Sequence, residues 1–180
     1  MTPPSIALID YNADRVTWQN QPTPEVYHCL QDDHSVSWLD VQGSPEVSVW
    51  TLIAQGCGLG DDAIERITRA QEFGTRAKLE EYPGVIVIMF RMVSCEGDRF
   101  RSQSVSLAIG AQWLISVQEQ TDYDCFERVR DQLRHHHASL CRRGADYLAY
   151  ALLDATIDSF FPVLEHYGER IAALEAQVIT

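Results

Sequence analysis

The sequence predicts an α+β fold: an α/β/α sandwich with a mixed, partly antiparallel sheet and flanking helices, followed by a long amphipathic helix. Short strand-like and helix-like segments alternate up to about residue 120. A nearly continuous apolar run covers residues 85–93, and beyond residue 146 apolar side chains recur every three or four positions. We therefore divide the chain into an α/β sandwich domain over residues 1–143 and a long acidic helix over residues 144–180.

The first third of the chain contains short strands and two helices. The spacing of Val47, Trp50 and Ile53 predicts a helix from near residue 44 to the Gly-rich segment GCGLG. A second short helix is expected to begin at Asp61 or Asp62. The strands are expected over residues 5–9, 15–18 and 36–41.

The middle of the chain is rich in strands. The run VIVIMFRMV at residues 85–93 predicts a strand that is buried on both faces. Residues 99–110 then alternate in polarity and meet residues 111–120 at Gly110-Ala111, which predicts a β-hairpin. The charged residues 78–81 are expected at a strand edge.

Two long helices follow the hairpin. Residues 121–124 have the T-x-x-D form of a capping box, and apolar side chains between Phe126 and Leu140 predict one helix, which the segment Arg142–Gly144 ends. The final helix is expected to start after this Gly, with Asp146 as its cap.

Composition and charge restrict the classes of function. At 180 residues and 46% hydrophobic, the chain can bury one core. Its formal charge of -12 disfavours nucleic acids and anionic membrane surfaces and favours metal cations. Five widely spaced Cys without a C-x-x-C pair predict neither a disulfide framework nor a zinc knuckle. No secretory signal is visible, and the longest apolar stretch, Val85–Phe90, is far shorter than the roughly 20 residues of a membrane helix. We expect a soluble, cytoplasmic polypeptide.

The final helix carries a regular apolar stripe, which we call the apolar seam. We expect the seam to pack on its own sheet or on the preceding helix rather than in an intermolecular coiled coil. Pro162 should kink the helix by removing the hydrogen bond to the Asp158 carbonyl. No capping residue follows Val178, so the helix is interpreted as truncated. The seam consists of Tyr150, Leu153, Ile157, Phe160, Leu164, Tyr167, Ile171, Leu174 and Val178.

A row of carboxylates lies beside the seam. At 100° per residue, Asp154, Asp158, Glu165 and Glu169 fall within about 60° of one another. One interpretation is a solvated face that keeps an amphipathic helix soluble. The other is a site for hard divalent cations, which prefer oxygen ligands. The spacing does not decide between them.

Other reactive side chains favour structural roles. The run His135-His136-His137 is expected on a polar helix surface, since consecutive helical residues point about 100° apart and a zinc site would also need a ligand such as Cys141. Cys57 is expected to be a small buried hydrophobe. Because no nucleophile, base and orienting group can be assembled, we do not expect an enzyme.

Three stretches of the sequence resemble one family. They are GTRAKLEEYPGVIVIMFRMV at residues 74–93, the hairpin SVSLAIGAQWLISVQEQ followed by FERVRDQL, and the segment that starts at RRGADYLAYALLDATID. The motif G-x-D-Y-L-x-Y-x-L-x-D at residues 144–154 is the most specific part. Together they look like the cytosolic N-terminal region of CorA-type divalent metal ion transporters, over roughly residues 36–180.

The resemblance implies a fold and a function. Members of that family are homopentameric channels, mainly for Mg²⁺, Co²⁺ or Ni²⁺, with a branch that transports Zn²⁺. Each subunit has an α/β sandwich, a pair of acidic antiparallel helices, a stalk helix and two membrane helices. The final helix here would be the first of the acidic pair, leading toward a missing stalk and membrane region.

From this resemblance we expect a regulatory, metal-sensing domain on the cytoplasmic side of the inner membrane. Its partners would be other copies of the chain and divalent cations, Mg²⁺ before Co²⁺, Ni²⁺ or Zn²⁺. It would meet the membrane only through the missing region, and it would bind no nucleic acid. The candidate metal ligands are Asp154, Asp158, Glu165, Glu169, Asp61 and Asp62.

One departure from the family pattern affects these ligands. The family commonly has an L-E-D motif whose Asp contributes to a regulatory cation site between subunits. Here Arg66 takes the Asp position, and a guanidinium cannot ligate a cation. Asp61, Asp62 or Glu65 would have to substitute. The alternative function is a free-standing soluble protein that self-associates through the seam and transports nothing.

Overall fold

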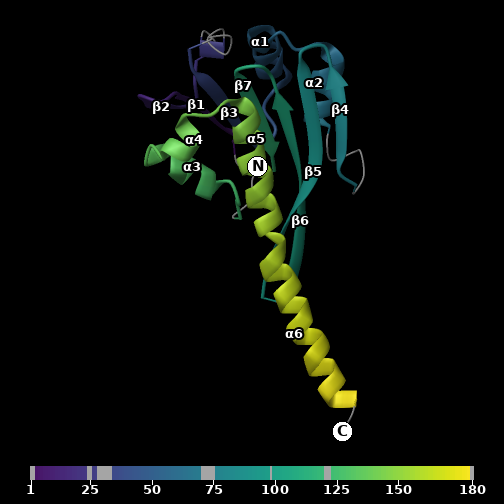
Figure 1. Ribbon diagram of the computed structural model, residues 1–180. Helices are drawn as coiled ribbons and strands as arrows, with labels where there is room; N and C mark the ends of the chain where they lie inside the picture. The colour runs from purple at the N-terminus through teal and green to yellow at the C-terminus, as the bar shows by residue number, and fades with distance from the viewer. Residues whose placement is uncertain are drawn as a thin grey trace.

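The fold has the predicted α+β class, with a mixed sheet and helices on both of its faces. The computed structural model describes residues 3–23, 26–27, 34–69, 76–97, 99–119 and 123–178. One seven-stranded mixed sheet has the strand order β2-β1-β3-β7-β6-β5-β4. Helices cover both of its faces, and a long carboxyl-terminal helix extends away from it (Figure 1).

Neighbouring strands pair antiparallel, except at the centre of the sheet. There β3 and β7 are parallel, and the long connection between them contains helices α1 and α2 and strands β4, β5 and β6. The predicted hairpin is confirmed as β6 and β7, which pair antiparallel across residues 110–112. The strands are β1 (Ser5–Tyr11), β2 (Val16–Asn20), β3 (Val36–Gln42), β4 (Lys78–Tyr82), β5 (Val85–Glu96), β6 (Arg99–Ile109) and β7 (Trp113–Gln118).

Two apolar clusters form the core, one on each face of the sheet. On one face α1 and α2 pack on the strands through residues such as Ile53 and Ile67. On the other face α3, α4 and α5 contribute Leu133, Leu140 and Leu148. The helices are α1 (Val47–Cys57), α2 (Asp61–Thr68), α3 (Glu127–Arg134), α4 (Ala138–Cys141), α5 (Ala145–Asp158) and α6 (Phe160–Val178).

The strand at residues 85–93 is less buried than predicted. Ile86 is 40% exposed, and Ile88 and Phe90 are half-buried. The reason is its place in the sheet, since only the edge strand β4 lies beyond β5. Lys78–Tyr82 forms that edge strand, as the charged segment predicted.

The predicted continuous helix over residues 126–140 is wrong. It divides into α3 and α4, and the three His residues form the break rather than a helix surface. His136 has a left-handed backbone with φ of 51°, and its N–H bonds to the Leu133 carbonyl at 2.9 Å. The proposed capping box begins at residues that lie outside the described part of the chain, but Asp124 Oδ1 does accept the Phe126 N–H at 2.9 Å.

The start of the final helix also differs from the prediction. Gly144, not Asp146, occupies the N-cap position of α5. Asp146 lies in the first turn, where its Oδ1 accepts the backbone N–H of Tyr147 at 2.8 Å. Asp146 therefore still satisfies one of the free N–H groups at this helix end.

Helices α5 and α6 follow one another with a single interruption at Ser159. Pro162 has no N–H for the Asp158 carbonyl, which accounts for the interruption one turn earlier in the chain. Ser159 Oγ donates to the Thr156 carbonyl at 2.6 Å and stabilises this point. In Figure 1, α6 continues in the direction of α5, so the predicted kink does not turn the chain.

The apolar seam does not pack on the sheet, contrary to the prediction. Tyr150, Ile157 and Leu164 are 56%, 61% and 63% exposed, and apart from Leu153, which is half-buried against the core, the seam stays exposed as far as Val178. A different face of the helix is buried. It consists of Ala145, Leu148, Ala149, Leu152, Ala155, Thr156, Ser159 and Val163.

The long carboxyl-terminal helix is also apolar enough to resemble a membrane-spanning helix. By length and composition alone, Ala145–Val178 is the one helix among the described residues that could cross a membrane. Its first half packs on the sheet, and a core helix of a soluble protein satisfies the same criterion. Leu148 and Leu152 of this helix belong to a core cluster of the sheet, although they lie beyond residue 143. The division of the chain into two domains at residue 143 stays a prediction.

Candidate metal centre

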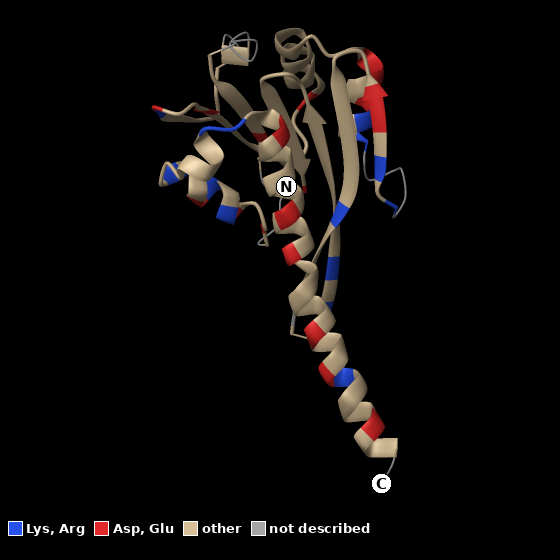
Figure 2. Cartoon of the chain, in the orientation of Figure 1, with Lys and Arg blue, Asp and Glu red and all other residues tan. Residues whose placement is uncertain are grey.

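The four carboxylates of the final helix are exposed to solvent. Asp154 and Asp158 lie on α5, and Glu165 and Glu169 lie on α6, which contacts β5 and then extends beyond the sheet (Figure 1). Figure 2 shows acidic residues at intervals along these two helices. Asp158 Oδ2 pairs with Arg128 Nη1 of α3 at 2.8 Å. The Asp158 side chain is 49% exposed and the Arg128 side chain 67% exposed. An exposed ion pair of this kind contributes about 0–1 kcal/mol.

The helix geometry keeps these carboxylates apart. At a rise of about 1.5 Å per residue, Asp154 and Asp158 are about 6 Å apart along the axis, and Asp158 and Glu165 about 10 Å. Divalent cations hold oxygen ligands at about 2–2.6 Å, so the four cannot converge on one ion. Within the described part of the chain, no group of three His, Cys, Asp or Glu could hold a metal. A cation bound here would need further ligands from another chain or another segment.

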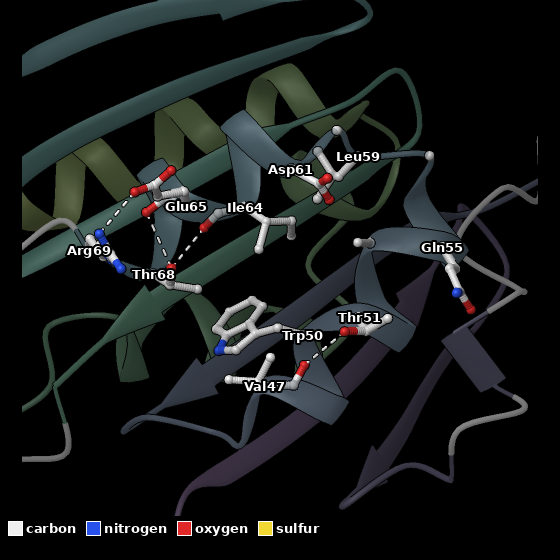
Figure 3. Close-up of a pocket in the computed structure, with 13 residues that line it drawn as sticks. Val47, Trp50, Thr51, Gln55, Leu59, Asp61, Ile64, Glu65, Thr68 and Arg69 are labelled. Carbon is white, nitrogen blue, oxygen red and sulfur yellow. Dashed lines mark hydrogen bonds and ion pairs between the residues drawn. The ribbon is translucent and has the colours of Figure 1, made fainter.

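Asp61 and Asp62 occupy the first turn of α2 and are exposed. A carboxylate at this position stabilises the helix through its dipole, which gives both residues a structural role without a metal. Asp61 also lines a groove of about 850 Å³ between α1 and α2, whose apolar side includes Trp50 and Ile64 (Figure 3). Their role as metal ligands stays a prediction.

Glu65, the third potential substitute, already has a partner. Its Oε1 accepts from Arg69 Nη1 at 2.9 Å, one helical turn later, at the rim of the same groove (Figure 3). Both side chains are more than half exposed, so the pair is weak and the carboxylate stays accessible.

Arg66 connects α2 to the edge strand. Its Nε lies 2.6 Å from Glu80 Oε2, and the Tyr82 hydroxyl donates to the same oxygen at 2.9 Å. Partial burial would raise the pKa of Glu80, but the hydrogen bonds from Tyr82 and Arg66 outweigh this effect and lower it. The side-chain cation at this position therefore already neutralises a carboxylate of β4.

Within the described residues, the His run and Cys141 do not gather into a metal site. The rings of His135 and His137 are 6.4 Å apart, and His135 Nδ1 contacts the Asp131 carbonyl at 2.8 Å. Cys141 is buried in the core. Cys57 is also buried, as predicted, and burial raises its pKa to about 12, so it stays a thiol at neutral pH.

A buried polar network that the sequence patterns did not predict is centred on Arg130 of α3, which is 4% exposed. Its Nε and Nη2 donate to Asp40 Oδ2 on β3 at 3.0 and 2.7 Å. The Ser116 hydroxyl on β7 donates to the other Asp40 oxygen at 2.7 Å. Arg130 Nη1 also contacts Asp124 at 2.5 Å and Glu127 at 2.9 Å. The network links α3 to the two parallel strands at the centre of the sheet.

Electrostatics in this network balance burial against pairing. Burial raises the pKa of Asp40, and the Arg130 guanidinium and the Ser116 hydroxyl oppose that rise. Burial would lower the pKa of Arg130, but Asp40 and Asp124 outweigh it and raise that pKa. Two signals in the sequence could have revealed the network. Asp40 interrupts an apolar strand, and Arg130 follows Phe126 by four residues on the apolar side of its helix.

Comparison with known proteins identifies the family. A family model described as CorA-like Mg²⁺ transporter protein matches residues 33–180. The cobalt/magnesium transport protein CorA of Thermotoga maritima is 26% identical over 152 residues, which cover 83% of this chain and 42% of that protein. The chain thus spans less than half the length of this relative.

Solved structures share the fold. The complete CorA magnesium transporter from Methanocaldococcus jannaschii aligns with a TM-score of 0.70 at 16% identity, over 99% of this chain and 52% of that one. The soluble domain of CorA from the same organism aligns with a TM-score of 0.66 at 16% identity, over 97% of this chain and 64% of that one. With the family model matching residues 33–180, the chain belongs to the family of CorA-like Mg²⁺ transporter proteins.

Proposed function

We propose that this chain is the cytosolic regulatory domain of a CorA-like divalent cation transporter and that it senses the intracellular cation level. The observation that carries the proposal is the exposed row Asp154, Asp158, Glu165 and Glu169 in a member of this family. The full-length protein would be a homopentamer in the inner membrane, with this domain on the cytoplasmic side.

The proposed mechanism is relief of charge repulsion. The carboxylates of one chain are too far apart to share an ion, so the proposed sites lie where copies of the chain, or a further segment of it, bring a second set of ligands. Without cation, the gathered carboxylates repel one another. A bound cation removes this repulsion and favours the assembled, closed state by its differential affinity for that state.

Mg²⁺ is the first candidate among the cations. The proposed ligands are all carboxylates, which suit this hard ion, and it keeps several waters that can bridge exposed groups. The Thermotoga relative is a cobalt/magnesium transport protein, which supports Co²⁺ as a second candidate. Ni²⁺ and Zn²⁺ rank lower, because they favour nitrogen or sulfur ligands.

We propose that Arg66 prevents this family member from binding a regulatory cation at the α2 region. Its guanidinium pairs with Glu80, which also accepts the Tyr82 hydroxyl, so a positive charge is permanently present where the family pattern has an Asp. We infer that regulation by cation depends here on the final helix rather than on Arg66 and its neighbours Asp61 and Asp62.

Thermal unfolding with MgCl₂, against KCl of equal ionic strength, tests the proposal. At ten times the dissociation constant, binding adds about 1.4 kcal/mol, which corresponds to a Tm increase of roughly 3–6 °C. Asp154→Asn/Asp158→Asn is expected to lose most of this increase. Glu175→Gln, on α6 but outside the row, is the matched control and should retain it. An unchanged Mg²⁺ response in the double variant removes Asp154 and Asp158 as ligands.

A second candidate function rests on the exposed seam. A helix with apolar residues such as Leu164 and Ile171 more than half exposed suits a free-standing protein that self-associates. Immunoblots of membrane and soluble cell fractions separate the two candidates. The transporter proposal predicts a larger membrane-bound species, whereas a soluble species of 20.4 kDa would favour the interaction protein.

A further inference from the structure

A second pocket lies on the opposite side of the sheet from the α1–α2 groove, where the end of β1 meets the α4–α5 junction. Its volume is about 290 Å³, well above the roughly 10–15 Å³ that one water requires. Its lining includes the polar residues Asn12, His34 and Ser35 from the amino-terminal part of the chain, and Arg142 and Arg143 from the α4–α5 junction. The pocket can therefore hold a small polar ligand.

The charge around this pocket is unlike that of the whole chain. The chain has a formal charge of -12, yet among the residues that the structure describes no Asp or Glu lines the pocket, whereas two consecutive Arg residues do. The Arg143 guanidinium carbon lies 5.5 Å from the centre of the Tyr147 ring, which holds this cation beside the first turn of α5. Gly144, the N-cap of this 14-residue helix, also lines the pocket. The free N–H groups of a helix N-terminus attract anions.

A buried hydroxyl adds an independent indication of a ligand. Tyr11 lines the pocket and is 1% exposed, and its hydroxyl has no hydrogen-bond partner. The ring lies in the core cluster of the sheet face that α4 and α5 cover, together with Cys141 and Ala145, so the hydroxyl points toward the α4–α5 junction. Burial raises the pKa of Tyr11, with smaller contributions from Cys141 and Asp146, so the hydroxyl keeps its proton and can donate it. Leaving such a donor unpaired is unfavourable.

We propose that this pocket binds a small oxyanion of the phosphate type, held by Arg142, Arg143, the Tyr11 hydroxyl and the N-terminal end of α5. Two guanidinium groups match the geometry of phosphate oxygens, and a neutral phenol supplies a further donor. Asp146 is the opposing group, since its exposed carboxylate lies in the first turn of α5. The site is separate from the proposed cation ligands and does not depend on them.

Calorimetric titration with potassium phosphate, at constant ionic strength in KCl, tests the site. Saturable binding with one site per chain is expected. Arg142→Gln/Arg143→Gln should weaken it at least about tenfold, because a hydrogen bond to a charged group is lost at each position. Arg76→Gln/Arg99→Gln has the same change in charge at exposed positions away from the pocket and should bind phosphate like the unmodified chain.

Two further variants distinguish a built site from a general charge effect. Tyr11→Phe should weaken phosphate binding without lowering stability in the absence of phosphate, because its hydroxyl has no partner there to lose. Asp146→Asn should tighten binding, because it removes the opposing charge and keeps an oxygen acceptor. Adenosine monophosphate in a parallel titration distinguishes a phosphate ester from free phosphate as the natural ligand.

The proposal is overturned by either of two results. One is the absence of saturable phosphate binding to the unmodified chain. The other is binding that the two Arg double variants weaken equally, since that pattern indicates an electrolyte effect only.

Discussion

Replacing Arg130 with Met should lower the free energy of unfolding more than removing any other charged side chain of the helices. The side chain is 4% exposed and makes two hydrogen bonds to Asp40, at 3.0 and 2.7 Å. Met fills a similar volume but, within the part of the chain that the structure describes, leaves the buried Asp40 carboxylate with the Ser116 hydroxyl as its one side-chain partner. Breaking a buried ion pair in this way typically costs about 3–5 kcal/mol.

The structure also sets an upper limit on the cost. Once Arg130 is absent, Asp40 can take up a proton instead of remaining charged. Protonating a carboxyl group with an ordinary pKa of about 3.9 at pH 7 costs roughly 4 kcal/mol. Burial already raises the pKa of Asp40, and loss of the Arg130 guanidinium, which opposes this rise, moves the folded-state pKa further above its unfolded value; the folded variant then binds a proton that the unfolded chain releases. The penalty should therefore shrink by up to about 1.4 kcal/mol for each unit that the pH falls from 7 toward 5.

Urea unfolding followed by circular dichroism measures this effect. Arg128→Met is the matched control, because Arg128 lies on the same helix and is 67% exposed, and it should cost less than about 1 kcal/mol. Arg130→Met with Asp40→Leu should recover most of the lost stability. A cost below about 1 kcal/mol for Arg130→Met, or a penalty independent of pH, would refute the reasoning.

Three further predictions concern packing, titration and the seam. Gly56→Ala should lower the free energy of unfolding by at least about 2 kcal/mol, because the added Cβ would collide with the Tyr27 carbonyl. Gly60→Ala is the control, since open space surrounds Gly60, and in the same urea assay it should change the free energy of unfolding by less than about 1 kcal/mol. Burial raises the pKa of Cys57 to about 12, so above pH 9 the unfolded chain loses a proton that the folded chain keeps, and stability falls as the pH rises. Cys57→Ala should reduce this alkaline loss of stability by up to about 1.4 kcal/mol per pH unit. Thermal unfolding between pH 9 and 11 measures the difference. Leu164→Gln should change stability by less than about 1 kcal/mol, since Leu164 is 63% exposed, and should weaken self-association in light scattering.

Local patterns in the sequence predicted most of the fold. The strands and their hairpin follow from apolar runs bounded by turn residues, and Lys78–Glu81 marked the edge strand because charges are tolerated there. The break at His136 was not predictable in this way. A left-handed residue usually carries a Gly or Asn signal, and here a His adopts that conformation.

The orientation of the final helix shows why periodicity alone was insufficient. This helix has two apolar faces, and the more regular one, the apolar seam, stays exposed. The buried face contains Ala149 and Ala155 beside Leu148 and Leu152, and such small residues allow a helix to approach a sheet closely. Regular spacing identifies a stripe on a helix but not the surface that it contacts.

The carboxylate row was found from the sequence, whereas the Arg130 network was not. Exposed charges on a helix follow directly from its period. A buried ion pair between Asp40 and Arg130 joins residues far apart in the chain, so only the tertiary structure brings them together. The same limit applies to metal sites between copies, which the sequence of one chain cannot define.

Sedimentation equilibrium of the chain with and without Mg²⁺ tests most directly whether the carboxylate row binds cations between copies. We expect the average mass to rise with Mg²⁺ concentration, and we expect Asp154→Asn/Asp158→Asn to abolish this dependence while Glu175→Gln preserves it. If Mg²⁺ leaves the mass unchanged, or raises it equally in the double variant, these carboxylates do not mediate a cation-dependent assembly.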